Sequence, residues 1–171
     1  MNKIKLIAPA LLVLSMAACS PSTTTEQSTT TDSTTVAPAS QADTALTAKL
    51  AVPQNVVEAS PIELTFTVYN KTDSARTFCK WHTPFEPLMS KYLDITNVNG
   101  EEANYQGPMA KRMMPPPADS YMILKPGDSV SVKTDLRQAY NIKGTGKFVV
   151  KYNSENISGL KVTDSLVFTI K

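Results

Sequence analysis

The stretch IELTFTV, from Ile62 to Val68, decides the fold class. Its large apolar residues occupy every second position, and Glu63 and two threonines stand between them. Successive side chains of a β-strand point to opposite faces, so this period of two buries one face and leaves the other in water. The stretch therefore predicts an antiparallel strand at the surface of a hydrophobic core.

Similar short runs follow one another from residue 46 to the end of the chain, and turn-forming residues separate them. The other predicted strands are Leu46–Val52, Arg76–Trp81, Tyr92–Val98, Tyr121–Leu124, Ser129–Leu136, Lys147–Tyr152 and Leu160–Ile170. The predicted turns are Asn70–Ser74, Asn99–Gly100, Lys125–Asp128, Gly144–Gly146 and Asn153–Gly159. Short strands at this spacing, with no sustained helical period, predict one all-β domain over residues 46–171. We expect an immunoglobulin-like antiparallel β-sandwich of seven to eight strands.

A single core is expected for a domain of this length. Its predicted members are Phe66, Trp81, Leu93, Ile95, Ile123, Val130, Val132, Phe148, Val150 and Phe168. Cys79 has aromatic neighbours and is expected to be buried rather than redox-active. Phe148 stands where many such sandwiches keep a corner tyrosine and lacks its hydroxyl, which leaves Tyr140 as the alternative.

The N-terminus has the pattern of a bacterial lipoprotein signal peptide over residues 1–18. Two lysines precede an apolar stretch from Leu6 to Ala18, and Cys19 follows the small residues Ala17 and Ala18. The stretch is shorter than the roughly 20 residues of a membrane-spanning helix. We expect cleavage before Cys19 and lipidation of that residue, with ordinary secretion as the alternative. Ser20 gives no inner-membrane retention signal, so the expected location is the outer membrane, facing the periplasm.

Residues 19–45 are predicted to be the lipidated cysteine and a disordered tether. This segment is rich in Ser and Thr and nearly free of large apolar residues, so it cannot bury enough surface to offset its ordering entropy. Without residues 1–18 the chain holds 15 basic and 15 acidic residues. A neutral chain without a basic stripe is not expected to bind nucleic acid. We expect a monomer with a membrane anchor at Cys19.

Two proline-containing segments, Trp81–Ser90 and Tyr105–Ser120, interrupt the strand pattern. Long loops on a rigid scaffold commonly carry binding sites. The candidate residues for contact with a protein or peptide partner are Trp81, His82, Phe85, Tyr105, Lys111, Arg112, Met113 and Met114. Solvated charge is the default interpretation of the basic pair, and a carboxylate-binding site or a processing site is the alternative.

Motifs in these loops and the following strands resemble a known family. They are Cys79–Glu86 (CKWHTPFE), Tyr105–Pro108 (YQGP), Lys111-Arg112, Leu124–Val130 (LKPGDSV), Asp135-Leu136 and Ala139-Tyr140. In order and spacing they resemble the non-catalytic N-terminal domain of deuterolysin-like (aspzincin, peptidyl-Lys) metallopeptidases. The resemblance covers roughly residues 46–152 and implies a protease-associated domain.

We expect no peptidase domain of that family in this chain, because the zinc motif of that domain does not occur in the sequence. The zinc site of that domain needs the two histidines of H-E-x-x-H, and this chain has one histidine, His82. No G-x-S-x-G motif presents a nucleophilic serine, and Gly144-Thr145-Gly146 lacks the pattern of a phosphate loop. We therefore expect no enzymatic activity and no cofactor, while a hydrolase with an unrecognised site stays an alternative.

Methionines offer a second alternative. Met109, Met113 and Met114, together with His82, are soft ligands that suit Cu(I) in the periplasm. Methionine also forms adaptable apolar surfaces for protein partners, and no repeated copper-binding spacing is present. The favoured interpretation is a non-catalytic envelope lipoprotein that binds a protein or peptide, in association with a separate protease.

Overall fold

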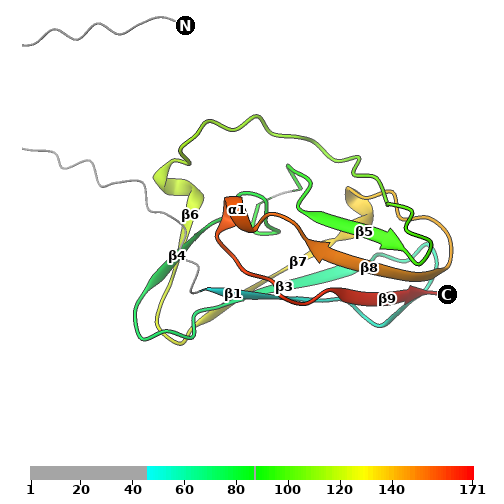
Figure 1. Cartoon of the computed structure of the whole chain (residues 1–171), viewed down its shortest axis with the longest axis horizontal. Helices are drawn as coiled ribbons and strands as arrows, with labels where there is room; N and C mark the ends of the chain where they lie inside the picture. The colour runs from blue at the N-terminus through cyan, green and yellow to red at the C-terminus, as the bar shows by residue number, and fades with distance from the viewer. Residues whose placement is uncertain (1–45, 87) are drawn as a thin grey trace, which may run out of the picture. The chain divides into compact units, whose positions relative to one another are not determined.

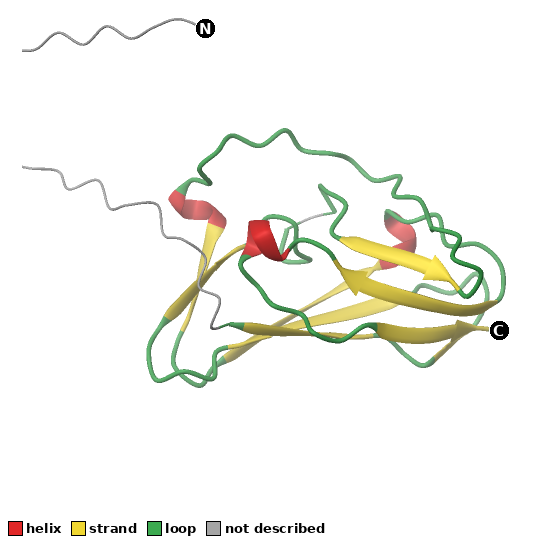
Figure 2. Ribbon diagram, viewed as in Figure 1, coloured by secondary structure: helices red, strands yellow, loops and turns green. Residues whose placement is uncertain are grey.

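The computed structural model describes residues 46–86 and 88–171 of the chain. The predicted signal peptide, Cys19 and the predicted tether lie outside the described residues. These described residues form nine strands, one short α-helix and two 3-10 turns. Figures 1 and 2 show their arrangement. The elements are β1 (Thr47–Ala51), β2 (Asn55–Val56), β3 (Glu63–Tyr69), β4 (Arg76–Cys79), β5 (Leu93–Asn97), η1 (Ala118–Ser120), β6 (Tyr121–Leu124), β7 (Ser129–Asp135), η2 (Leu136–Gln138), β8 (Gly146–Tyr152), α1 (Glu155–Ser158) and β9 (Leu166–Ile170).

The strands form three sheets. One has the order β1-β3-β7, another β2-β9-β8-β5, and a two-stranded ribbon pairs β4 with β6. All pairs are antiparallel except β2 with β9. This is the predicted all-β sandwich, and every predicted strand segment contains a strand. Residues 55–56 were not predicted because two residues are too few to show a period.

The buried side chains form two clusters. One lies around Leu64, Ile95 and Phe168, and the other around Phe66 and Phe78. Half-buried residues, among them Leu50 and Tyr152, pack against both clusters. The predicted single core is therefore divided because β4 and β6 extend it beyond the two larger sheets.

One predicted core residue is wrong. Ile123 is 72% exposed, whereas its neighbour Leu124 is buried and Met122 packs against the core. Alternation in β6 puts Ile123 on the opposite face from these two side chains. Val130 and Val132 point inward but are only half-buried, because β7 is an edge strand. Trp81, at 8% exposure, is in the core as predicted.

Asn70 joins β3 to β4 and β7 to β6. The Asn70 N–H donates to the carbonyl of Asp128 at 2.9 Å, which continues the β3–β7 ladder. The buried Asn70 amide then donates to the carbonyls of Ser74, Leu124 and Lys125 at 2.8–3.0 Å. The ladder therefore resumes as β4–β6 beyond a bend whose polar groups Asn70 satisfies.

The Tyr140 hydroxyl bonds to the backbone of another segment, as a corner tyrosine does. Its hydroxyl accepts hydrogen bonds from the backbone N–H groups of Tyr92 (3.3 Å) and Leu93 (3.1 Å). The start of β5 is thereby fixed to the segment after η2. Burial raises the pKa of Tyr140 to about 12, so the hydroxyl stays protonated at neutral pH.

Candidate binding surface

The segment of residues 81–86 and 88–90 contacts the segment 105–120, and together they form one surface, the two-loop surface. The Ala110 N–H donates to the carbonyl of Met89 at 2.8 Å, and the Tyr105 hydroxyl donates to the carbonyl of Leu88 at 2.9 Å. Figure 1 shows the second segment as a long loop that runs across one side of the domain to η1 and β6. Two segments that are separate in the sequence therefore act as one structural unit.

Trp81, Glu86 and Arg112 fasten the two segments together. The Arg112 guanidinium lies over the Trp81 ring, 4.7 Å from its centroid, and also forms an ion pair with the Glu86 carboxylate. The ion pair is largely shielded, with side-chain exposures of 23% and 14%. Screening by water is weaker in such a place, so both the stacking and the ion pair hold the loops more firmly than a surface pair would. Arg112 is thus not the solvated charge that is the default for a loop arginine.

Three methionines stand on the outside of this unit. Met109, Met113 and Met114 are 70%, 84% and 68% exposed, and Lys111 between them is exposed as well. Large apolar side chains gathered within six residues on an anchored loop are typical of a contact surface. We call these three residues the methionine crest.

A hollow of about 280 Å³ opens beside the Glu86–Arg112 pair. Its lining residues are Lys80, Trp81, Phe85, Glu86, Asp119 and Ser120. The aromatic rings give it an apolar wall, and the charged groups of both signs give it a polar rim. A hollow of this size accepts one side chain of a partner rather than a large ligand.

Phe85 and Tyr105 connect this surface to the core. The Phe85 ring makes edge contacts with the rings of Phe66 and Phe78, at centroid distances of 6.1 and 5.4 Å. The Tyr105 ring packs edge-on against Tyr140 at 5.2 Å. Both side chains are half-buried, so they anchor the loops to the core and leave only part of each ring at the surface.

His82 contacts the end of β8 and the segment that follows it. Its Nδ1 lies 3.5 Å from the Ser154 hydroxyl, and its carbonyl accepts a hydrogen bond from Tyr152. Burial lowers the pKa of His82, and the positive charge of Arg112 lowers it further while Glu86 opposes this. The hypothesis that His82 joins the methionines in a Cu(I) site stays a prediction.

The fold is also visible in comparisons with known proteins. A family model of the immunoglobulin-like domain matches residues 49–154. The chain belongs to the immunoglobulin-like domain family. No curated protein matches its sequence.

Two solved structures are similar to this immunoglobulin-like domain at low levels. They are a mutant β-glucosidase from Listeria innocua in complex with laminaribiose (12% identity, TM-score 0.40) and the β-glucosidase from the same organism in complex with gluconolactone (12% identity, TM-score 0.37). The matches cover 74% and 73% of this chain. The chain spans 16% of the length of each enzyme, and nothing about glycoside hydrolysis follows from so distant a likeness.

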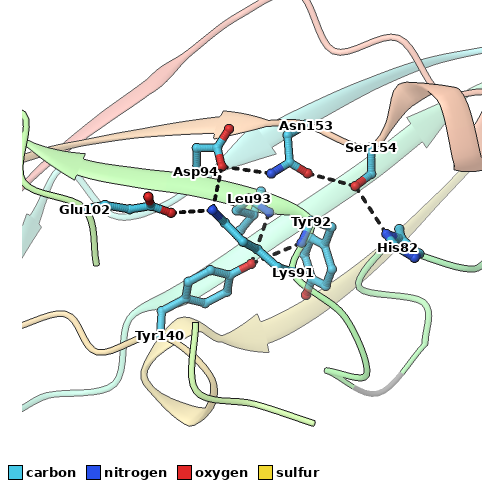
Figure 3. Close-up of polar contacts among 9 residues, drawn as sticks. All are labelled: His82, Lys91, Tyr92, Leu93, Asp94, Glu102, Tyr140, Asn153 and Ser154. Carbon is cyan, nitrogen blue, oxygen red and sulfur yellow. Dashed lines mark hydrogen bonds and ion pairs between the residues drawn. The ribbon is translucent and has the colours of Figure 1, made fainter. Parts of the chain in front are cut away.

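The polar contacts around His82 do not form a hydrolytic triad in the immunoglobulin-like domain (Figure 3). The Ser154 hydroxyl donates to the Asn153 side-chain oxygen at 2.8 Å, and the Asn153 amide donates to Asp94 at 2.9 Å. Asp94 in turn forms an ion pair with Lys91 at 3.1 Å. A triad needs the carboxylate to orient the histidine and the histidine to take the serine proton, whereas here an amide separates them.

Within residues 46–86 and 88–171, no three His, Cys, Asp or Glu side chains are grouped so that they could hold a metal ion. None of the helices described in this range is both long and apolar enough to cross a membrane.

Glu86, Asp119 and Ser120 belong to this surface but were not among the predicted partner-binding residues, and Met109 was predicted only as a Cu(I) ligand. Glu86 stands in the motif CKWHTPFE, and Arg112 lies 26 positions after it. The available sequence signal for this ion pair was a carboxylate in one loop and an arginine in the other. The sequence could not pair them because their contact depends on how the loops cross.

Proposed function

We propose that this chain is a non-catalytic envelope lipoprotein whose immunoglobulin-like domain binds a protein or peptide through the two-loop surface. The observation that carries the proposal is the methionine crest: three exposed methionines stand on a loop that Arg112 holds through Trp81 and Glu86. A fixed backbone with adaptable apolar side chains lowers the ordering cost of binding and still fits a partner surface.

The resemblance to the N-terminal domain of deuterolysin-like metallopeptidases supports a partner class. A domain that accompanies a peptidase, in a chain without the peptidase zinc motif, suits an accessory role toward a separate protease. Such a role covers targeting, folding or inhibition of that protease. The lipoprotein pattern at Cys19 supports an outer-membrane location that faces the periplasm.

A capture experiment tests the binding surface. The wild-type protein and a variant with Met109→Ser, Met113→Ser and Met114→Ser are cross-linked to envelope proteins of the source cell. The matched control carries Val57→Ser and Val98→Ser, which change exposed apolar residues outside the two loops. We expect the crest variant to lose the cross-linked species that the wild type and the control retain. Equal capture by all three proteins would refute the proposal.

The association with a protease has its own test. The purified protein is added to the catalytic domain of a deuterolysin-like metallopeptidase, and casein hydrolysis is followed. We expect a change in rate that the crest variant does not produce. An unchanged rate, together with crest-dependent capture of another protein, would remove the protease from the proposal and keep the binding surface.

A further inference from the structure

Strand β7 has one free side. It lies at the edge of the β1-β3-β7 sheet and pairs only with β3 in the described part of the chain. The Leu136 N–H donates to the carbonyl of Ile62, and the Asn70 N–H donates to that of Asp128, so even-numbered positions face β3. Because backbone groups alternate along an antiparallel strand, the N–H and C=O groups of Ser129, Ser131 and Lys133 point away from the sheet.

The other long edges of the two larger sheets are bonded, at least in part, to segments of the same chain. At β1, the Ala48 N–H donates to the carbonyl of Lys161 at 3.0 Å. At β5, the Ala103 N–H donates to the carbonyl of Ile95 at 2.8 Å, and Asn97 bonds to Glu101. Within residues 46–86 and 88–171, no backbone hydrogen bond reaches the outward side of β7. Among the long outer edges of the two larger sheets, the β7 edge is therefore the one with no backbone hydrogen bond on its outward side in the described chain.

Apolar side chains beneath this edge are also incompletely covered. Val130 and Val132 point toward the core and are half-buried, while their register partners Val68 and Phe66 on β3 are fully buried. A strand added beside β7 would cover the exposed part of both valines. The edge thus offers unpaired backbone groups and an apolar strip at the spacing of alternate residues.

The features that commonly prevent an edge strand from pairing with another chain are weak or absent in β7. Residues 129–135 contain no proline. Lysine at an edge commonly prevents pairing, but the Lys133 amine is drawn back across the sheet to Glu63 of β3, at 2.7 Å. Ser131 likewise bonds to Thr67 of β3 rather than projecting from the edge.

We propose that the free edge of β7 binds an extended segment of a partner polypeptide as an added β-strand. The segment is apolar at alternate positions, so that one set of its side chains covers Val130 and Val132. Its backbone pairs with the outward groups of Ser129, Ser131 and Lys133, which is the β-augmentation mode of peptide recognition. This site is separate from the methionine crest and does not depend on it.

Backbone amide NMR of the ¹⁵N-labelled protein tests the proposal. The probe is a synthetic peptide with the alternating sequence of residues 62–69 and a lysine tail for solubility. We expect the amide signals of Ser129, Ser131 and Lys133 to exchange fast in the free protein. The peptide should shift these signals and slow their exchange by about tenfold or more. The same peptide with N-methylated alternate amides, which cannot pair, should have no such effect.

A proline variant gives the matched control. Ser131→Pro removes an N–H that does not bond to β3, so the β3–β7 ladder should survive and peptide binding should fall by about tenfold or more. Ser131→Ala should bind like the wild type. An unfolding curve confirms that the proline variant folds, and Ser129→Pro replaces it otherwise.

Three outcomes would overturn the proposal. The first is strong protection of the Ser129, Ser131 and Lys133 amides in the free protein. The second is peptide binding that neither proline variant weakens. The third is a concentration-dependent shift of these signals without peptide, which would make a second copy of this chain the occupant of the edge.

Discussion

Single residues in this domain matter most where a polar or reactive group is buried. Cys79 is fully buried, and desolvation is the main cause that raises the pKa of its thiol. His82 is half-buried and has its pKa lowered by burial and by Arg112. Both groups are thus held in their neutral forms by their surroundings, and each leads to a measurable consequence.

Cys79 should be unreactive in the folded protein. In a chain that begins at Ser20, and so lacks the other cysteine, we expect a thiol reagent such as DTNB to label Cys79 many-fold more slowly in buffer than in urea. The reason is that the thiolate is disfavoured and the side chain is inaccessible. Rapid labelling of the native protein would show that Cys79 is accessible and would contradict its buried position.

His82 should make the domain less stable in mild acid. The unfolded chain takes up a proton near pH 6.5, whereas the folded protein resists protonation of His82 because its pKa is lowered. The unfolded state therefore binds more protons, and the free energy of unfolding falls as the pH decreases below about 6.5, until the native His82 also titrates.

The measurement is the urea midpoint across this pH range, for wild type and for His82→Asn. Asparagine tolerates the left-handed backbone of this position, where φ is 57°. The variant should show a flatter pH dependence. If both proteins lose stability in parallel, His82 is not the source of the acid sensitivity.

At the scale of elements, two polar contacts set how strands meet. Asn70 carries the ladder of β3 and β7 across a bend into β4 and β6. Tyr140 ties the start of β5 to the segment that follows η2. Each contact satisfies several backbone groups at once, so its loss leaves more than one buried polar group without a partner.

Asn70→Ala should lower the free energy of unfolding by about 2–4 kcal/mol. The substitution removes the two amide N–H groups that are shared among the carbonyls of Ser74, Leu124 and Lys125, and it leaves the buried carbonyl of Leu124 without this donor. Denaturant unfolding measures the loss. The control is Asn104→Ala at an exposed site, which should change stability by no more than about 0.5 kcal/mol. Equal effects of the two substitutions would contradict the special role of Asn70.

Tyr140→Phe should cost about 1–3 kcal/mol, because the N–H groups of Tyr92 and Leu93 lose their acceptor while the ring stays in place. Thermal unfolding compares it with Tyr69→Phe on β3. Faster amide exchange at Tyr92 and Leu93 should accompany the loss. An unchanged exchange rate at both positions would show that the hydroxyl does not hold the start of β5.

At the scale of the whole molecule, the proposed function joins a binding domain to a membrane anchor. The immunoglobulin-like domain carries the two-loop surface and the free edge of β7. In the proposal, lipidation of Cys19 fixes the location. The anchor has a direct test. Wild-type protein expressed in bacteria should incorporate labelled palmitate and fractionate with membranes, whereas Cys19→Ser should do neither. Label in the Cys19→Ser variant would place the acyl group elsewhere.

The alternation of residues 62–68 and its counterparts was enough to predict an all-β sandwich. This held because a strand that is buried on one face imposes a period of two on its own sequence. The same reasoning failed at Ile123, where an apolar residue in a short strand faces solvent. In four residues, Tyr121–Leu124, apolar side chains occupy both faces, so the sequence alone does not say which face is covered.

The sequence by itself determined the fold class, the lipoprotein pattern at Cys19 and the loops in which a binding surface was to be sought, because each of these is a local pattern. Only the tertiary structure decided that Arg112 lies over Trp81 and pairs with Glu86, that Asn70 joins two ladders, and that β7 keeps a free edge. These contacts join residues that are distant in the chain. Their formation depends on how strands are ordered and how loops cross, which no local period encodes.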